Sequence, residues 1–190
     1  RPPRSTLFPY TTLFRSTLWR AKVKPDGTFA QPEILADDLP DGGQHPNRTL
    51  AFGPDGRFYV SVGSSCNACE ETNPEHATML VMDANGKNRE VFASGLRNTI
   101  GFGWHPVTGE LWGMDHGSDA RGDDVPPEEL NQIVEGKDYG WPWAYGKREV
   151  DPITGDPEQG TKEERARKSE PSTLEYRAHS APIGMVFGGV

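Results

Sequence analysis

The feature that most constrains the fold of this chain is a repeated pattern in which two short, β-prone apolar runs flank a turn closed by glycine. Pro-Asp-Gly and Asn-Gly sequences provide the fixed φ and the positive φ that tight turns between antiparallel strands require. Such turns occur at residues 24–27, 53–56, 83–86 and 105–109. The sequence therefore predicts a series of hairpins and an all-β fold.

Alternating or continuous apolar residues on both sides of these turns mark the expected strands. We expect strands at residues 17–23, 49–52, 57–62, 79–82, 89–92, 100–104, 110–114 and 181–187. Residues 127–134 fit either a short helical turn or an irregular strand. Residues 147–172 are polar and predict an exposed insertion loop, in which the charged run 163–168 forms a solvated face rather than a binding site.

The spacing of the glycine turns is compatible with a β-propeller, whose blades are four-stranded sheets of roughly 40–50 residues. On that blade length, the chain after residue 16 holds about three to four blades. We therefore expect a propeller fragment that is truncated at both ends.

Residues 1–16 do not fit the pattern that follows them. Residues 6–16, TLFPYTTLFRS, look like the in-frame translation of a widely used sequencing-library adapter. The alternative is a natural hairpin, because Phe, Tyr and Thr favour strands. We expect residues 1–16 to be an artefact and residues 17–190 to be the domain, so the native N-terminus and any signal peptide would be missing.

Charge and hydropathy narrow the classes of partner. The chain has 20 Lys and Arg against 28 Asp and Glu, a net charge of −8. A nucleic-acid-binding face is basic, so this balance argues against a nucleic-acid partner. No apolar run approaches the roughly 20 residues that a membrane-spanning helix needs. We expect no membrane span and a neutral or cationic partner.

Two polar groups could carry chemistry. His45 lies on a glycine-flanked loop, where an imidazole with a pKa near 6.5 is either a general base or an ordinary surface residue. Arg97 and Asn98 follow Gly95-Leu96, and they offer a planar donor fork and an amide. Taken alone, the pair is equally compatible with an arginine that bridges two blades.

An acidic, glycine-containing stretch covers residues 115–131. Carboxylates mixed with backbone carbonyls suit a hard cation such as Ca²⁺, although the spacing is not that of an EF-hand and acidic loops without an ion are common. Cys66 and Cys69 form a single C-x-x-C motif, for which redox activity, half of a zinc site and a local disulfide are open. In an exported protein we favour the disulfide.

Taken together and in this order, several strings resemble the glucose/sorbosone dehydrogenase family, and most closely its L-sorbosone dehydrogenase branch. The matching stretches are His45–Gly56, Phe58–Ser64, Phe92–Asn98, His105–Trp112, Glu129–Asn131, Tyr139–Pro142 and His179–Met185. The resemblance implies a six-bladed β-propeller and a dehydrogenase that depends on pyrroloquinoline quinone (PQQ). It also implies an aldose or sorbosone-type sugar substrate, an external electron acceptor, and a periplasmic or secreted location.

The resemblance assigns roles around the quinone. His45 stands where the family has the base that takes the hydroxyl proton as hydride moves to PQQ. Arg97 and Asn98 stand where the family contacts the carbonyl side of PQQ, and His179 lies near the cofactor.

The same resemblance implies two calcium sites. The backbone carbonyls of Gly117 and Ser118 would hold the Ca²⁺ that clamps PQQ. Glu129 and the carbonyl of Tyr139 would belong to a second, structural Ca²⁺ site.

The sequence departs from the family at three points. Gln44 replaces the Asp that precedes the base in some members, and Thr99 stands where the family usually has Pro. The basic residues that grip the PQQ carboxylates would lie beyond Val190, so we expect this chain alone to bind PQQ poorly and to turn over little.

Two other functions stay open at this point. The first is a non-catalytic propeller that binds a ligand or a protein, and the second is a calcium-dependent, lactonase-like hydrolase. A binding module has no need of both His45 and the Arg97-Asn98 pair on one rim, and the acidic residues cluster in one loop instead of surrounding a central ion. We therefore favour the dehydrogenase.

Overall fold

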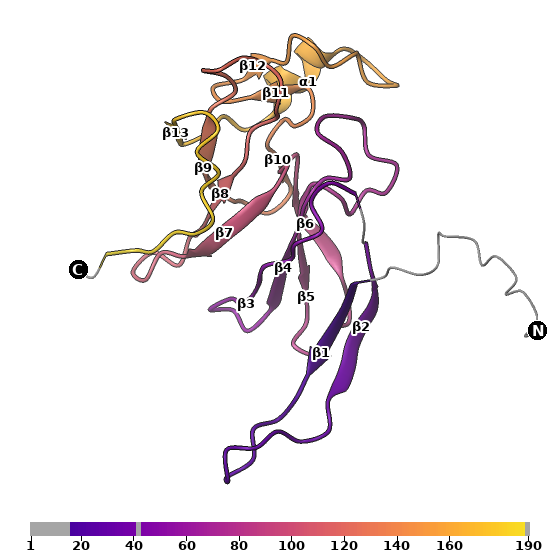
Figure 1. Cartoon of the computed structure of the whole chain (residues 1–190), viewed down its shortest axis with the longest axis vertical. Coiled ribbons are helices and arrows are strands. Elements are labelled where there is room, and N and C mark those ends of the chain that lie inside the picture. Colours follow the sequence, from indigo (N-terminus) through magenta and orange to yellow (C-terminus); the bar gives the residue numbers. More distant parts are fainter. Residues whose placement is uncertain (1–15, 41–42, 189–190) are drawn as a thin grey trace, which may run out of the picture. The chain divides into compact units, whose positions relative to one another are not determined.

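The computed structural model describes residues 16–40 and 43–188, and the chain divides into one compact unit up to Gly42 and a second from Gly43. The first unit contains one antiparallel hairpin, formed by β1 (Ser16–Arg20) and β2 (Glu33–Leu39) (Figure 1). The adapter interpretation falls almost wholly outside the described residues, apart from Ser16, which pairs with Leu39.

The second unit contains two larger sheets, each with four antiparallel strands that form a blade. In the first, β3 (Leu50–Phe52), β4 (Phe58–Val62), β5 (Thr78–Met82) and β6 (Glu90–Ser94) form an antiparallel meander. The short β10 (Lys137–Asp138) joins β6 in parallel. Every residue of β4 and β5 is buried, which explains why their sequences are nearly continuous apolar runs instead of alternating ones.

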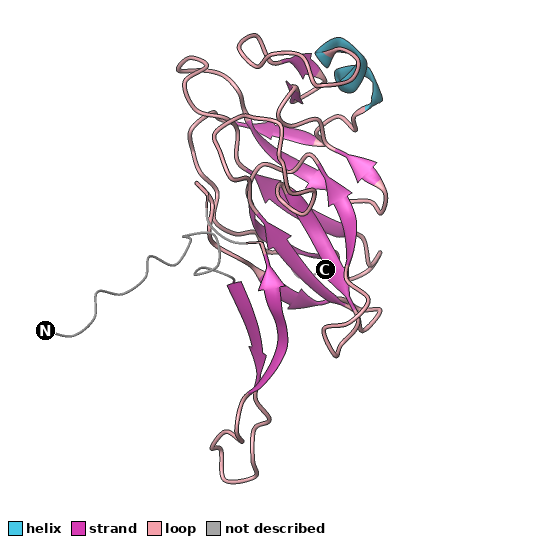
Figure 2. Cartoon of the chain, turned by 90° about the vertical axis from the view of Figure 1, so that its right-hand side faces the viewer, coloured by secondary structure: helices cyan, strands magenta, loops and turns pink. Residues whose placement is uncertain are grey.

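The second sheet contains β7 (Thr99–Trp104), β8 (Leu111–Asp115), β9 (Glu128–Gln132) and β13 (Leu174–Tyr176), in the order β13-β9-β8-β7. Figure 2 shows its strands beside those of the first sheet. One core joins the two sheets: the Tyr59 ring meets the edges of Phe92 at 5.2 Å and Trp104 at 5.0 Å between ring centroids. Successive four-stranded meanders that pack in this way form the blade arrangement of a propeller, and the chain is nearly all-β.

The remaining elements are β11 (Ala144–Tyr145), which precedes the polar insertion, and β12 (Glu149–Val150) and α1 (Lys162–Lys168), which lie within it. Thr161 and Glu164 close a reciprocal capping box at the start of α1. Within α1 only Ala166 is buried, so the charged run is largely solvated as expected. Among the described residues, no helix is long and apolar enough to cross a bilayer.

Two strand predictions need comment. Residues 127–134 form the strand β9 and not a helical turn. The strand predicted at residues 181–187 is wrong, because this segment runs without a ladder. Its backbone groups bond to side chains instead: Ala181 N donates to Glu128, and the Pro182 carbonyl lies 2.8 Å from His116 Nε2.

Candidate active site

The His45 loop is built against the end of β4. Gly43 has φ +70° and no room for a Cβ, which would lie 2.3 Å from Ser65 Cα. Gln44 N and His45 N donate to the carbonyls of Ser65 and Ser64 at 2.9 and 3.3 Å. The glycine thus lets the loop run along residues 64–65, and this path brings the imidazole to the site.

The tautomer of His45 follows from its partners. His45 Nδ1 lies 3.2 Å from the Ser64 carbonyl oxygen and 2.9 Å from Ser64 Oγ. The Ser64 hydroxyl donates its own hydrogen to the Cys66 carbonyl at 2.6 Å. Both partners therefore accept at Nδ1, so Nδ1 carries the proton and the Nε2 lone pair is available as a base.

The electrostatic setting keeps this imidazole neutral. Burial, followed by the nearby positive charge of Arg97, lowers the pKa of His45 to about 4. Ser64 performs the orienting task that a carboxylate at residue 44 would perform in some family members. Gly63 leaves room for the ring, since a Cβ there would lie 2.5 Å from His45 Cβ and 2.9 Å from Asn98 Oδ1.

Asp115, the last residue of β8, holds the turn that carries Arg97 and Asn98. Its carboxylate accepts from Arg97 N at 2.9 Å, Asn98 N at 2.8 Å and the Thr99 hydroxyl at 2.8 Å. Asp115 is buried, and burial raises its pKa. The departure from Pro at residue 99 thereby supplies a hydroxyl donor to this carboxylate, which a proline could not.

The Arg97 guanidinium has hydrogen-bond partners at Nε and Nη2. Its Nε donates to the Asn67 carbonyl at 2.9 Å, and its Nη2 donates to Asn67 Oδ1 at 2.9 Å and to Asp119 at 3.0 Å. Among residues 16–40 and 43–188, no acceptor is found for Nη1. This nitrogen can therefore donate to a ligand carbonyl.

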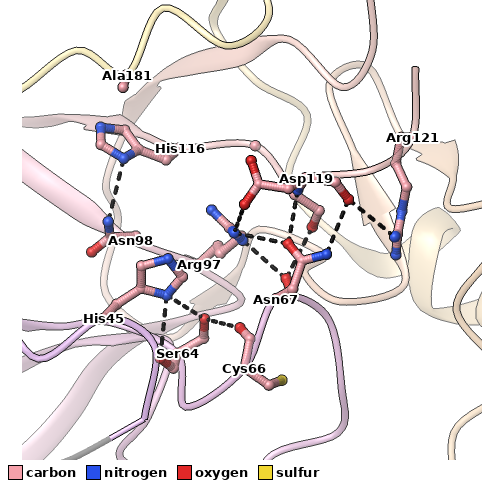
Figure 3. Close-up of polar contacts among 12 residues, drawn as sticks. His45, Ser64, Cys66, Asn67, Arg97, Asn98, His116, Asp119, Arg121 and Ala181 are labelled. Atoms are coloured by element: carbon pink, nitrogen blue, oxygen red, sulfur yellow. Dashed lines mark hydrogen bonds and ion pairs between the residues drawn. The ribbon is translucent and has the colours of Figure 1, made fainter. Parts of the chain in front are cut away.

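Asn98 points toward a second histidine. Its Nδ2 lies 3.3 Å from His116 Nδ1, while His116 Nε2 is turned toward the Pro182 carbonyl. Because a carbonyl only accepts, His116 is protonated at Nε2 and accepts from Asn98 at Nδ1. Figure 3 shows His45, Asn98 and His116 next to one another, with Arg97 beside them. The site thus presents one base, one cation and one oriented amide.

A cavity of about 20 Å³ lies beside this group. Five of the predicted site residues line it, together with Asp115: Arg97, Gly117, Ser118, Glu129 and Tyr139. A cavity of this volume holds one particle of the size of a water molecule. The residues predicted for the two calcium sites therefore meet at one small cavity.

The groups around this cavity suit a cation. Glu129 is fully buried, and burial raises its pKa to about 8, although Gly146 N and Asn131 Nδ2 donate to its carboxylate. Asn131 contacts Glu129 without lining the cavity, and its Oδ1 is buried without a hydrogen-bond partner in the described part of the chain. The carbonyls of Gly117, Ser118 and Tyr139 likewise accept no hydrogen bond from the residues that the structure describes, so they are available as oxygen ligands.

His179 lies apart from this constellation. It follows β13, has a positive φ of +59°, and its Nε2 is 2.7 Å from the Gly122 carbonyl. The structure gives it no contact with His45, Arg97 or Asn98 among the described residues.

Sequence reasoning singled out the acidic stretch and the C-x-x-C motif, but it did not predict that residues in and beside them orient the predicted site residues. These are Ser64, Asn67, Asp115, His116 and Asp119, which contact His45, Arg97 or Asn98. The only local signal was that each stands next to a strand end or a motif already singled out. Their pairing across the chain becomes visible only in the fold.

Comparisons with known proteins now place the chain. A family model described as Glucose / Sorbosone dehydrogenase matches residues 10–188. The chain belongs to the glucose/sorbosone dehydrogenase family. An uncharacterized protein of Borreliella burgdorferi is 34% identical over 134 residues, which are 69% of this chain and 33% of that protein.

Solved structures agree on the fold. A calcium structure of a family AA12 carbohydrate-active enzyme from Trichoderma reesei matches with a TM-score of 0.70 and 20% identity, over 87% of this chain and 52% of that one. The soluble aldose sugar dehydrogenase of Escherichia coli, in its apo form, matches with a TM-score of 0.64 and 18% identity, over 88% and 51%. This family member thus has the sugar-dehydrogenase propeller fold and spans about half the length of these solved relatives.

Proposed function

We propose that the chain supplies the base and part of the cofactor site of a PQQ- and Ca²⁺-dependent dehydrogenase that oxidises an aldose or a sorbosone-type sugar. The observation that carries the proposal is the pairing of a neutral His45, whose Nε2 has no hydrogen-bond partner in residues 16–40 and 43–188, with an Arg97 guanidinium whose Nη1 is likewise unpartnered there. A non-catalytic binding propeller has no need for a base in its unprotonated form beside a fixed cation.

His45 acts as the general base. Its Nε2 accepts the proton of the sugar hydroxyl, and Ser64 holds the Nδ1–H so that the ring cannot turn away. The bound PQQ would supply the redox chemistry, because it accepts the hydride that leaves the sugar carbon. The protein contributes the position of the base and the removal of the proton.

Arg97 and Asn98 would bind the carbonyl side of the quinone. The Nη1 group can donate to a carbonyl oxygen, and its positive charge favours negative charge that develops there. Since Asp115 fixes the backbone of both residues, the donors are in place before the ligand binds. His179 stays a predicted cofactor-side residue on the resemblance alone.

The cavity beside Arg97 would hold calcium. Gly117 and Ser118 would provide carbonyl oxygens on the cofactor side, and Glu129 and the Tyr139 carbonyl would provide oxygens for a structural ion. A buried carboxylate next to carbonyls that lack hydrogen-bond donors is the donor set that a hard cation requires. The calcium ion would therefore compensate groups that the fold leaves uncompensated.

The disulfide supports an exported protein. Cys66 and Cys69 are joined in the structure, as predicted. Disulfides persist in the periplasm and outside the cell. We accordingly propose a periplasmic or secreted location, with a small-molecule sugar substrate and an external electron acceptor.

The test is dye-linked sugar oxidation by a protein in which residues 17–190 are joined to the remaining blades of a propeller. Activity is expected only when both PQQ and Ca²⁺ are added, and the 190-residue chain alone is expected to show little. His105→Ala, in the exposed turn between β7 and β8, is the control for His45→Ala. Activity without PQQ would contradict the proposal, and full activity of the His45→Ala variant would leave the binding-module function in its place.

A further inference from the structure

The loop between β4 and β5 is closed on itself next to Arg97. The Cys66–Cys69 disulfide ties residues that are three positions apart, and Asn67 lies inside this small ring. The Cys66 carbonyl accepts from Ser64, the residue that orients His45. The position of Asn67 is thus fixed from both ends, by a covalent bond and by a hydrogen bond at its neighbour.

Asn67 makes two of the three side-chain hydrogen bonds of Arg97. Its carbonyl accepts from Nε and its Oδ1 accepts from Nη2, both at 2.9 Å (Figure 3). The third partner, Asp119, has a side chain that is 64% exposed, whereas the Arg97 side chain is 4% exposed. The buried guanidinium therefore depends on Asn67 for its fixed direction, because a solvated carboxylate can follow it in several orientations.

Asn67 also holds the segment that follows His116. Its Oδ1 accepts from Asp119 N at 2.8 Å, and its Nδ2 donates to the Asp119 carbonyl at 3.0 Å. Its own carbonyl accepts from the Ser118 hydroxyl and from Trp141 Nε1, both at 3.3 Å. Both polar atoms of the side chain and the backbone oxygen are used, and their partners belong to separate parts of the chain.

We infer that Asn67 is a positioning residue that fixes the Arg97 guanidinium relative to the backbone of residues 117–119. The importance of this arrangement for catalysis rests on the proposed function, in which Arg97 meets the quinone and the Gly117 and Ser118 carbonyls meet its calcium ion. One amide then sets the distance between the cation and the carbonyls, and the disulfide keeps that amide in place.

The direct measurement is the hydrogen exchange of the Arg97 Nη2–H signal, whose acceptor on Asn67 is the side-chain Oδ1, observed by nitrogen-15 NMR on the 190-residue chain without PQQ or Ca²⁺. Asn67→Ala is expected to accelerate this exchange about tenfold or more, because it removes the side-chain bonds to Arg97 and Asp119. Asn67→Asp keeps an acceptor for Nη2 and is expected to restore most of the protection. The amide signals of Gly117–Asp119 are expected to shift in Asn67→Ala.

Two further variants make the result specific. Asn73→Ala is the matched control, because Asn73 lies in the same β4–β5 loop but its side chain accepts from Glu75 N and bonds to neither Arg97 nor Asp119 among the described residues. The pair Cys66→Ser and Cys69→Ser frees the ring and is expected to accelerate the Arg97 exchange while leaving the strands folded. Unchanged exchange in folded Asn67→Ala, or equal acceleration in Asn73→Ala, overturns the inference. If Asn67→Ala does not fold, unchanged exchange in the folded double-cysteine variant overturns it.

A kinetic measurement separates this inference from the proposed function. In the propeller-completed enzyme, Asn67→Ala is expected to weaken PQQ binding and lower kcat, and to add little to the loss caused by Arg97→Ala, because both changes act through one guanidinium. Altered exchange in a protein without PQQ-dependent activity would refute the proposed function and leave the positioning role intact. PQQ-dependent activity with fully additive variants would refute the positioning role alone.

Discussion

The neighbourhood of His45 and Arg97 lies beside the cavity at Glu129, but the two regions differ in how fully their polar groups are compensated by protein partners. Around His45 and Arg97, most polar groups have a protein partner, and the atoms without one among the described residues include His45 Nε2 and Arg97 Nη1, which would meet a ligand. At the cavity, burial raises the pKa of the Glu129 carboxyl although each of its oxygens accepts a hydrogen bond, and the neighbouring Asn131 Oδ1 is buried without a partner among the described residues. The first region is organised before anything binds, and the second needs an ion to complete it.

The largest expected effect is the loss of kcat when His45, in the first region, is replaced. In the completed enzyme, His45→Ala should lower kcat by about 10²–10⁴-fold and leave PQQ affinity nearly unchanged, because a base acts in the transition state. Steady-state kinetics and PQQ titration measure the two quantities, with His105→Ala as the control. A variant that retains full kcat would show that the ring only fills space.

Arg97→Ala should lower kcat less than His45→Ala does, but it should also weaken PQQ binding. We expect about 10- to 100-fold losses in PQQ affinity, since one charge-assisted hydrogen bond contributes about 1.5–3 kcal/mol. We expect a loss of similar size in kcat, because the same bond strengthens as negative charge develops on the quinone oxygen in the transition state. The same titration and kinetics apply. An arginine that merely bridges blades would instead lower the melting temperature and leave the affinity unchanged.

The pH dependence of kcat/KM tests the protonation state of His45 in the first region. Its pKa is lowered to about 4, so the base is unprotonated and active above that value and is lost as the pH falls through it. We expect kcat/KM to be level from pH 7 to about 5 and to fall about tenfold per pH unit below 4, with circular dichroism to verify folding. A fall that begins near pH 6.5 would mean that the imidazole is solvated like an ordinary one.

Calcium tests the second region without any turnover. A ligand at one hundred times its Kd stabilises the folded state by about 2.7 kcal/mol, which corresponds to a rise in melting temperature of roughly 5–10 °C for a chain of this size. We expect this rise with Ca²⁺ for the 190-residue chain and its loss in Glu129→Gln. Glu163→Gln, on the solvated helix α1, is the control. An equal rise in both variants would place the ion elsewhere.

Local sequence was sufficient for most of the fold. The Pro-Asp-Gly and Asn-Gly turns act through the φ angles of a few residues, so the strands beside them were predicted to within one or two residues, as at β4 and β5. β2 was missed because its sequence, EILADDL, is largely polar and exposed. The strand at residues 181–187 was wrong because apolar composition cannot show whether a sheet edge is available.

The site was predictable only in part, for a related reason. His45, Arg97 and Asn98 were found because their chemistry is written in the residue type and in the family's motifs. Ser64 and Asp115 were not, because a serine or an aspartate gains its role from partners elsewhere in the fold. The orientation, tautomer and protonation state of the site residues depend on such partners. A sequence therefore identifies the reactive residues more readily than the residues that orient them.

Under the proposed function, Gly63 has a consequence for any redesign of the substrate specificity. The two nearest atoms that its missing Cβ would meet belong to His45 and Asn98, at 2.5 and 2.9 Å. Any side chain at this position would displace His45 and Asn98 together. Substitutions elsewhere at the rim of the site would then have to restore the positions of both residues. A mutational library that varies substrate specificity should therefore keep Gly63 constant, because the positions of His45 and Asn98 both depend on it.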